Sequence, residues 1–262
     1  LAIASLCLVP AWRNFRAIQL QRHAVFYSAA AGLFLALHFA CWITSLSYTS
    51  IAASATLVTT NPVWVALLSW LWFREKPSPL TMAGIAITLI GSVGVALGSS
   101  GAFGGSQPLL GNALALIGSW AVSLYFLLGR EAQRRGLGIG SHAVLTYTTA
   151  AAVLLPLPLL FGTGYNGYSN SVYLWIVLMA VFPQLIGHTS FNWAVRWISP
   201  TLVTLTILAE PVGSSILGAI VFQENPGVPV ILGAAVILAG VAIAALGTRE
   251  RTASQTPADK TL

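Results

Sequence analysis

Glu210 is the residue whose type and surroundings point most directly to chemistry. It lies within an almost wholly apolar segment, TILAEPVGSSILGAIVFQENP (206–226), directly before Pro211. On insertion scales, a charge at the centre of a membrane helix costs about 2.5–3.5 kcal/mol, so such residues are usually functional. We interpret Glu210 as a proton-coupling carboxylate or as a counter-ion for a substrate amine. A protonated glutamate that hydrogen-bonds a neighbouring helix is the alternative.

Two histidines also lie in apolar segments, and aromatic and polar residues follow each of them. His38 opens the stretch HFACW and His188 opens HTSFNW. A histidine at lipid depth must face a cavity or another helix, and near neutral pH it can relay protons or bind a carboxylate. Asn192 follows His188 by four residues, so the two share a helix face. A substrate or proton role and simple helix–helix hydrogen bonding both remain open.

Aromatic residues inside the apolar segments can line a cavity or hold a cation against a ring face. Packing and interfacial belts are the alternative explanation for them. Neither histidine has a third ligand at helical spacing, so the sequence predicts no metal and no cofactor. The candidate solute-binding residues are His38, Trp42, Asn61, Trp120, Tyr125, His188, Asn192 and Glu210.

The elements that position these residues must be membrane helices. Hydrophobic residues make up 56% of the 262 residues and charged residues only 7%, whereas soluble domains carry about 25% charged residues. Apolar runs of about 20 residues match the thickness of the hydrocarbon core, and they do not alternate as barrel strands do. The sequence predicts an all-α polytopic membrane protein with a remnant span near 1–11 and eight complete spans near 25–46, 51–73, 79–98, 109–129, 140–161, 172–194, 201–222 and 228–247.

The basic residues support this count of spans. All twelve lysines and arginines fall on one side of the predicted membrane, which the positive-inside rule makes the cytoplasmic side. The net charge of +6 is therefore explained by topology, and a nucleic-acid partner is not predicted. The two cysteines, Cys7 and Cys41, lie in apolar runs and form no motif.

An internal repeat organises the chain. Residues 61–98 align without a gap to residues 210–247 at an offset of 149, and 13 of the 38 positions are identical. The turn near Glu75 falls on the basic side and the turn near Glu224 on the other side, so the copies are predicted to be inverted. Asn61 occupies the repeat position of Glu210. Inverted repeats are an architecture of secondary transporters, in which the solute site lies near the midplane.

Residues 48–97 and 187–240 resemble the two EamA modules of the drug/metabolite transporter superfamily. The shared pattern is a proline, a glutamate in a turn thirteen residues later, and a glycine-rich helix, and it occurs twice. The resemblance implies ten helices, five plus five inverted, with both ends in the cytoplasm. It also implies transport of amino acids and other small metabolites, mostly by export or exchange.

The resemblance also predicts how the chain is divided. Residues 1–108 form a first module, 109–247 a second, and 248–262 a flexible cytoplasmic tail. Relative to the ten-helix pattern, the first helix and most of the second are expected to be missing. The fold class predicted is thus an inverted-repeat five-plus-five bundle, truncated at its N-terminus.

The function predicted is secondary transport of small organic metabolites by alternating access at a midplane cavity. No Walker motif, aspartyl dyad, H-E-x-x-H helix or G-x-S-x-G elbow is present, so an enzyme is not predicted. The expected partners are a small-molecule solute and the lipid bilayer of a bacterial inner membrane. Proton coupling and a homodimer remain open. The alternative is a truncated membrane protein that does not transport, or a structural membrane subunit.

Overall fold

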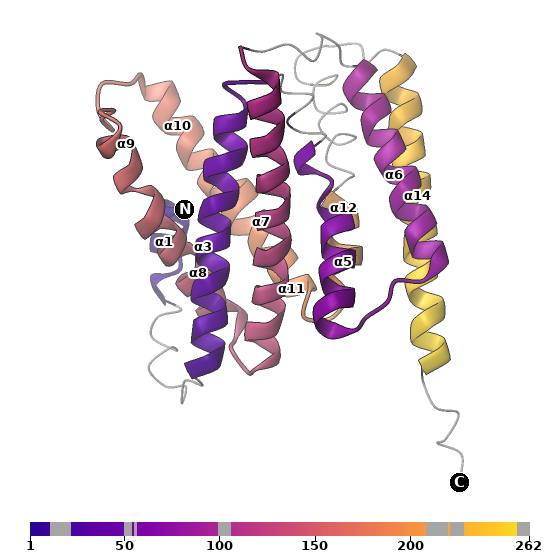
Figure 1. Cartoon of the computed structure of the whole chain (residues 1–262). Coiled ribbons are helices and arrows are strands. Elements are labelled where there is room, and N and C mark those ends of the chain that lie inside the picture. The colour runs from indigo at the N-terminus through magenta and orange to yellow at the C-terminus, as the bar shows by residue number, and fades with distance from the viewer. Residues whose placement is uncertain are drawn as a thin grey trace. The chain divides into compact units, whose positions relative to one another are not determined.

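A computed structural model describes residues 1–10, 22–49, 54, 57–98, 106–207, 220 and 228–255. Within these ranges the chain forms helices and no strand, as predicted (Figure 1). It divides into two compact units, which are described separately. Unit 1 comprises residues 1–41 and 120–198, and unit 2 comprises residues 42–119 and 199–262.

The helices follow the order of the predicted spans. They are α1 (Ala2–Cys7), α3 (Arg22–Ser45), α5 (Asn61–Phe73), α6 (Pro79–Gly98), α7 (Pro108–Arg134), α8 (Ile139–Leu154), α9 (Pro156–Leu160), α10 (Asn170–Met179), the π-helix η1 (Ala180–His188), α11 (Thr189–Ala194), α12 (Pro200–Ile207) and α14 (Val228–Gln255).

Among the described residues, four segments are long and apolar enough to cross a membrane. They are Arg22–Ser45, Pro108–Arg134, Ile139–Leu160 and Asn170–Ala194. Shorter apolar helices occupy Asn61–Phe73, Pro79–Gly94 and Ile231–Ala244. The all-α polytopic class predicted from composition is therefore confirmed.

Serine–proline pairs start two of the helices. Ser78 precedes α6 and its Oγ accepts a hydrogen bond from the backbone N–H of Thr81 at 3.0 Å. Ser199 precedes α12 and accepts from the N–H of Leu202 at 3.2 Å. In each case the serine caps an N–H that has no partner within the helix, and the following proline has no N–H to lose.

Helix boundaries confirm the internal repeat. The helix α3 ends at Ser45 and α11 ends at Ala194, which is 149 residues later. Residues 79–98 form α6, and the equivalent residues 228–247 lie within α14. The repeat of sequence is therefore also a repeat of local structure.

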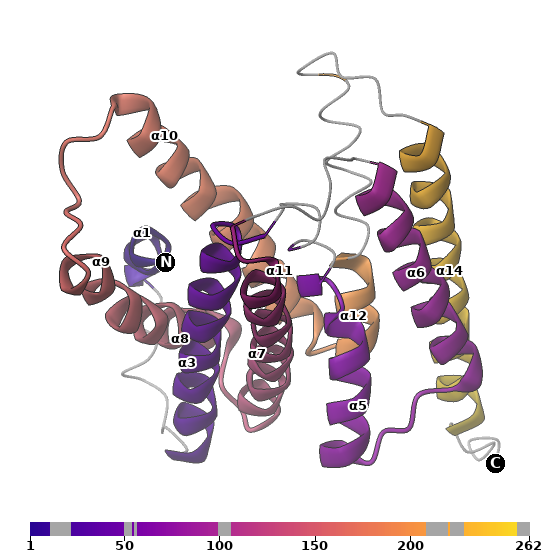
Figure 2. The same ribbon diagram turned by 45° about the horizontal axis from the view of Figure 1, so that its top comes forward.

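In unit 2, α6 and α14 pack against each other in opposite directions (Figures 1 and 2). A Cβ added to Gly84 would lie 2.6 Å from the carbonyl oxygen of Gly240, and one added to Gly91 would lie 2.9 Å from that of Gly233. The numbers rise along one helix while they fall along the other, so the helices are antiparallel. The two copies of the repeat thus run in opposite senses at this contact, as an inverted repeat requires.

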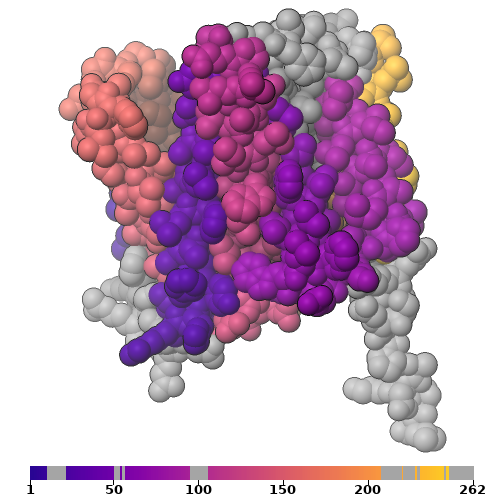
Figure 3. Space-filling view, in the orientation of Figure 1, coloured from indigo at the N-terminus to yellow at the C-terminus, as the bar shows by residue number. Residues whose placement is uncertain are grey.

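The contact between α6 and α14 is a glycine seam, defined here by Gly84, Gly91, Gly233 and Gly240. At Gly84, Gly91 and Gly240, backbone atoms of the opposite helix lie where a side chain would be. Small residues allow this close approach, which is how helices associate in lipid without a hydrophobic driving force. In the space-filling view, atoms of the yellow α14 show along the edge of the purple α6 (Figure 3).

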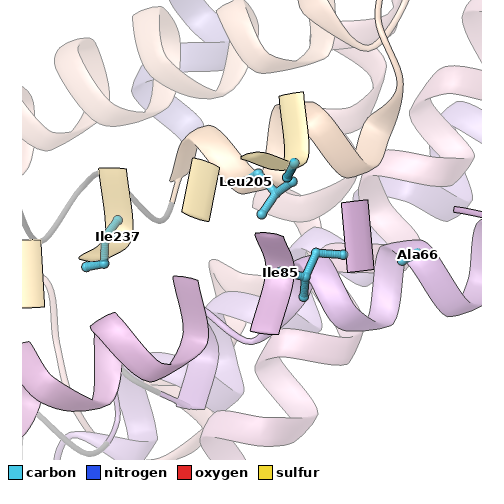
Figure 4. Close-up of a cluster of buried hydrophobic side chains, with 5 residues drawn as sticks. Ala66, Ile85, Leu205 and Ile237 are labelled. Carbon is cyan, nitrogen blue, oxygen red and sulfur yellow. The ribbon is translucent and has the colours of Figure 1, made fainter. Parts of the chain in front are cut away.

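A small apolar cluster lies beside this seam in unit 2. Its buried members are Ala66 of α5, Ile85 of α6, Leu205 of α12, and Ile237 and Ala244 of α14. Figure 4 shows Ile85 and Leu205 with their side chains close together, contributed by the two halves of the repeat. The cluster joins four helices through aliphatic contacts alone.

Three predicted helix features are corrected. The predicted span 51–73 is not one continuous helix, because Thr59 and Thr60 form a turn and Pro62 falls in the first turn of α5. The predicted span 172–194 is not a uniform α-helix, because the π-helix η1 interrupts it around Pro183. The helix α14 continues to Gln255, so the first residues of the predicted flexible tail are helical. Residues 248–255 include no proline. A proline disfavours α-helix at its own position and at the residue before it, so Pro257 does not prevent this extension.

Candidate functional site

Unit 1 encloses a group of buried polar side chains from α3, α7, α8, η1 and α11, which we call the polar cluster. Its members are Ser28, Tyr125, Gln133, His142, Thr146, Tyr147, Gln184, His188, Thr189 and Asn192. Among them, Ser28, Tyr125, His142, Thr146, Tyr147 and Asn192 are fully buried. Buried polar groups are costly unless they are hydrogen-bonded, so this concentration is a candidate site.

One face of η1 and α11 carries a polar row through the cluster. Gln184, His188 and Asn192 are spaced four residues apart, and the first and last are buried. The π-helix winds more widely than an α-helix and occurs frequently at functional sites. Pro183 lies inside η1 and has no N–H to donate. The row therefore begins where the regular α-helical pattern of backbone hydrogen bonds is already interrupted.

Asn192 is the most connected member of the cluster. Its Nδ2 donates to the backbone oxygen of His188 at 2.8 Å and to the hydroxyl oxygen of Tyr125. Its own backbone oxygen accepts a hydrogen bond from Gln133 Nε2 at 2.8 Å. This carbonyl belongs to the last turn of α11, where carbonyls have no partner within the helix. The predicted shared face of His188 and Asn192 is thus confirmed as a direct contact.

His142 links Asn192 to the first half of the chain. Its Nε2 lies 3.3 Å from Asn192 Oδ1, and its Nδ1 lies 2.5 Å from Ser28 Oγ. Thr146, one turn further along α8, donates to the backbone oxygen of Ser28 at 3.1 Å. The contact between α3 and α8 is therefore made through hydrogen bonds as well as through packing.

Tyr147 joins α8 to η1 and α11. Its hydroxyl lies 2.9 Å from Thr189 Oγ1 and donates to the backbone oxygen of Gln184 at 3.4 Å. In a π-helix each backbone carbonyl accepts a hydrogen bond from the N–H five residues later, whereas in an α-helix it accepts from the N–H four residues later. Where one pattern changes to the other, a side-chain donor can supply the hydrogen bond that a carbonyl loses. Tyr147 therefore stabilises the end of the π-helical segment.

Aromatic rings surround the His188 imidazole. The ring centroids of Phe39, Tyr125 and Phe126 lie 5.7, 5.8 and 6.4 Å from it. Phe39 also lies 5.0 Å from the ring of His38, which is 6% exposed. Both predicted histidines therefore lie close to one phenylalanine ring, that of Phe39.

Three buried side-chain atoms of the cluster have no hydrogen-bond partner among the described residues. They are His188 Nδ1, Gln184 Nε2 and Gln133 Oε1. Each buried group without a partner carries a desolvation cost of about 1–3 kcal/mol. His188 Nδ1 and Gln184 Nε2 belong to the same helix face, so they can serve a common hydrogen-bonding group of a ligand.

The other predicted residues are placed less consistently. Trp120 packs edge-on against Phe34, with ring centroids 6.3 Å apart, and is 42% exposed. Trp42 is half-buried, and its backbone oxygen accepts a hydrogen bond from Ser45 Oγ at 2.6 Å. Asn61 is buried at the start of α5. Trp42 and Asn61 belong to unit 2, and Glu210 lies outside the described residues.

Unit 1 thus contains five of the predicted residues. Tyr125, His188 and Asn192 belong to the polar cluster and His38 lies beside Phe39, whereas Trp120 is 42% exposed and packs against Phe34. Across the described residues, no group of three histidine, cysteine or acidic side chains has the arrangement of a metal site.

Sequence reasoning identified Tyr125, His188 and Asn192 and missed the other seven of the ten members of the polar cluster. His142, Tyr147 and Gln184 lie in predicted spans, yet no pattern singled them out. The stretch SHAVLTYT (141–148) carried a usable signal, because its polar residues recur at helical spacing within an apolar run. Gln184 beside Pro183 was a second such signal, since a polar residue in a span next to a helix breaker has no obvious packing role.

Comparison with known proteins gives a consistent result. An uncharacterised transporter of Archaeoglobus fulgidus is 25% identical over 78% of this chain and 71% of its own length. The uncharacterised transporter YxxF of Bacillus subtilis is 22% identical over 85% of this chain and 70% of its own length. A further uncharacterised transporter, from Clostridium kluyveri, is 22% identical over 75% of this chain and 64% of its own length.

A protein of known crystal structure has the same fold. It superimposes with a TM-score of 0.75 over 94% of this chain and 85% of its own length, at 21% sequence identity. The family of EamA-like transporters matches residues 1–97 and 109–246, which together make up most of the chain. The chain is therefore a multi-pass integral protein of the inner membrane and belongs to the EamA-like transporter family.

Proposed function

We propose that the chain is a secondary transporter that exports or exchanges small organic metabolites such as amino acids. The observation that carries the proposal is the polar cluster around His188, with two unfilled hydrogen-bonding atoms on one helix face. Membership in a transporter family supports the general role. The enclosed cluster supports a solute site, because polar groups that lack partners in the protein are satisfied when a ligand supplies them.

The composition of the cluster favours a solute with both polar and cationic groups. Gln184 Nε2 is a donor, and His188 Nδ1 is a donor or an acceptor according to its tautomer. The rings of Phe39, Tyr125 and Phe126 offer faces to which an ammonium group is attracted. An amino acid presents a carboxylate and an ammonium group together, which is why we name this class.

Alternating access is the mechanism that we propose. The π-helix η1 and the turn before α5 are interruptions of membrane helices, and interrupted helices commonly surround the solute in secondary transporters. A segment with an irregular backbone can change its winding at lower cost than a regular helix. We propose that η1 adjusts when the solute site opens first to one side of the membrane and then to the other.

The test is uptake by proteoliposomes that contain the purified protein, with a panel of 14C-labelled amino acids and other small metabolites. We expect uptake of at least one amino acid above empty liposomes. We expect His188→Ala to lower it at least tenfold, because the central ring of the cluster is lost. His23→Ala is the matched control, since His23 is exposed near the start of α3 and should leave uptake unchanged. Equal uptake by the two variants would contradict a solute site at His188.

Proton coupling through Glu210 is a separate part of the proposal. An imposed pH gradient should drive or slow uptake by the unchanged protein, and Glu210→Gln should abolish that response while uptake itself persists. If the Glu210→Gln carrier responds to the gradient as the unchanged protein does, Glu210 does not couple protons.

A further inference from the structure

One end of unit 1 gathers positive charge. It is formed by the start of α3, the end of α7 and the turn that follows α11. Two contacts join these elements, because the Arg135 guanidinium lies 4.8 Å from the Tyr27 ring of α3 and Gln133 donates to the backbone oxygen of Asn192. The charged residues described at this end are one glutamate, Glu131, and five arginines: Arg22, Arg130, Arg134, Arg135 and Arg196.

Two of these arginines differ in how their charge is used. Arg135 is occupied within the protein, because its Nε lies 2.7 Å from Glu131 Oε1. Arg196 is exposed, and among the described residues no carboxylate pairs with it. An arginine that the protein itself does not neutralise is available to an anion from outside.

Arg196 lies in an ordered turn, residues 195–198, directly after α11. Val195 is buried, and the backbone N–H groups of Trp197 and Ile198 donate to the carbonyl oxygen of Ala194 at 2.9 and 3.0 Å. The buried valine and the two hydrogen bonds hold the turn in one conformation. The side chains around Val195 are consequently presented outward in a fixed arrangement.

Two tryptophans accompany Arg196, and together they form the tryptophan–arginine turn, defined by Trp193, Arg196 and Trp197. The Arg196 guanidinium lies 5.4 Å from the centroid of the Trp197 ring, within the range of a cation–π contact. The ring centroids of Trp193 and Trp197 are 6.4 Å apart, and both rings are more than half exposed. A ring-face contact uses none of the guanidinium N–H groups in hydrogen bonds, so they remain for an acceptor.

The chemistry of this turn matches the boundary between hydrocarbon and headgroups. Tryptophan is enriched at that depth because its ring is apolar and its N–H is a donor. The guanidinium matches the geometry of a phosphate, to which it can donate two parallel hydrogen bonds. A zwitterionic lipid presents its own ammonium group beside the phosphate, whereas an anionic lipid does not. The positive charge at this end therefore favours an anionic lipid.

We propose that Trp193, Arg196 and Trp197 bind the phosphate group of an anionic phospholipid in the leaflet on the basic side of the membrane. Arg196 donates to the phosphate, and the two rings lie against the glycerol and the upper part of the acyl chains. The site is one helical turn beyond Asn192, so a bound lipid also holds the end of α11. This inference goes beyond the proposed function, and it does not depend on which solute is transported.

Native mass spectrometry tests the preference, with the purified protein in detergent and equal amounts of phosphatidylglycerol and phosphatidylcholine that have the same acyl chains. We expect the unchanged protein to retain mainly phosphatidylglycerol. Arg196→Gln should lower the affinity for it about fivefold, the factor that corresponds to about 1 kcal/mol for one arginine near an anionic surface. Equal retention of the two lipids by the unchanged protein overturns the proposal.

A matched variant separates the turn from the total charge of this end. Arg22→Gln removes the same charge from an exposed arginine at the start of α3, and it should leave the affinity nearly unchanged. If Arg22→Gln and Arg196→Gln lower the affinity equally, the charge of the whole end attracts the lipid and the proposed site is wrong.

A pair of tryptophan variants tests the contribution of the rings. Trp197→Leu stays apolar but loses the ring face that holds Arg196, so we expect a lower affinity for phosphatidylglycerol. Trp175→Leu is the control, since Trp175 is also exposed but lies on α10. Equal affinities of the two variants contradict the proposal.

Two further measurements distinguish a lipid site from a free anion site and from a folding defect. An excess of glycerol 3-phosphate should not displace phosphatidylglycerol, because it has no acyl chains, and full displacement overturns the proposal. Phosphatidylglycerol should raise the melting temperature of the unchanged protein more than phosphatidylcholine does. Arg196→Gln should lose this difference while melting normally in phosphatidylcholine, and a variant that keeps the difference contradicts the proposal. These measurements require no transport, so they stand apart from the test of the proposed solute site.

Discussion

The glycine seam of unit 2 and the polar cluster of unit 1 hold helices together by different means. At the seam, Gly84 and Gly240 let two backbones approach until no space remains for a side chain. In the cluster, His142 and Asn192 join helices by hydrogen bonds between side chains. Lipid gives helices no hydrophobic reason to associate, so close packing and hydrogen bonding are the two remaining ways.

The difference shows where chemistry can occur. At the seam, the Thr88 hydroxyl donates to the carbonyl oxygen of Gly84 within its own helix, so this polar atom already has a partner. The cluster is also buried, yet His188 Nδ1 and Gln184 Nε2 have no partner among the described residues. A structure built only for stability would favour apolar packing at these positions, since half-satisfied polar networks are less stable than an apolar core. Atoms of this kind are what we expect of the proposed solute site rather than of a contact that serves packing alone.

The largest effect is expected from adding one methyl group to the seam. In Gly240→Ala the new Cβ would lie 2.7 Å from the backbone nitrogen of Thr88 and 2.9 Å from the carbonyl oxygen of Gly84. Backbone atoms cannot move aside as a flexible side chain can, so α6 and α14 must separate. We expect a cost of about 1–3 kcal/mol or more, seen as a lower melting temperature in detergent. Gly164→Ala is the control, because nothing lies closer than 4.0 Å to a Cβ at Gly164, and it should melt as the unchanged protein does.

A smaller loss of stability, with a larger loss of transport, is expected in the cluster. Asn192→Leu keeps the branched shape of the side chain but leaves its hydrogen-bond partners, including the backbone oxygen of His188, without a partner. We expect a cost of about 1–3 kcal/mol, together with uptake reduced by more than the loss of folded protein explains. The control Asn170→Leu changes an exposed asparagine at the start of α10 and should do neither. If melting and uptake fell in proportion, Asn192 would serve stability alone.

The smallest effects come from two threonines that are both fully buried. Thr88 donates to the carbonyl oxygen of Gly84 in its own helix, whereas Thr146 of α8 donates to the carbonyl oxygen of Ser28 in α3. Hydrogen bonds between membrane helices contribute about 0.6 kcal/mol on average. We expect Thr146→Val to lower the melting temperature slightly and Thr88→Val to lower it less. If Thr88→Val lowered the melting temperature more than Thr146→Val, the hydrogen bond between helices in the cluster would contribute no more to stability than the one within a helix at the seam.

The seam was more predictable from sequence than the cluster. Gly84, Gly91, Gly233 and Gly240 recur every seven residues in two segments that align, and the order of the turns already required the segments to be inverted. Regular spacing and repetition determine which face of each helix is smooth. The antiparallel contact of α6 and α14 confirms that reasoning.

The cluster was predictable only in part. His188 and Asn192 were found because polar residues four apart share a helix face, and that prediction held within one helix. The contact of Asn192 with His142 depends on how α8 packs against α11, and a single sequence gives no information on such pairs. The π-helical winding of η1 was also missed, because apolar periodicity does not distinguish it from an α-helix over nine residues.

The glycine seam has a consequence for the ancestry of the chain. The offset of 149 residues carries Gly84 onto Gly233 and Gly91 onto Gly240, so it carries one facing pair of the seam onto the other. The seam therefore has a local two-fold axis, and it is the contact that two identical polypeptides make when they dimerise face to face. A gene duplication followed by fusion preserves such a contact without any new interface. After the fusion, the two copies can change independently of each other. Ile85 and its equivalent in the second copy, Ala234, already differ.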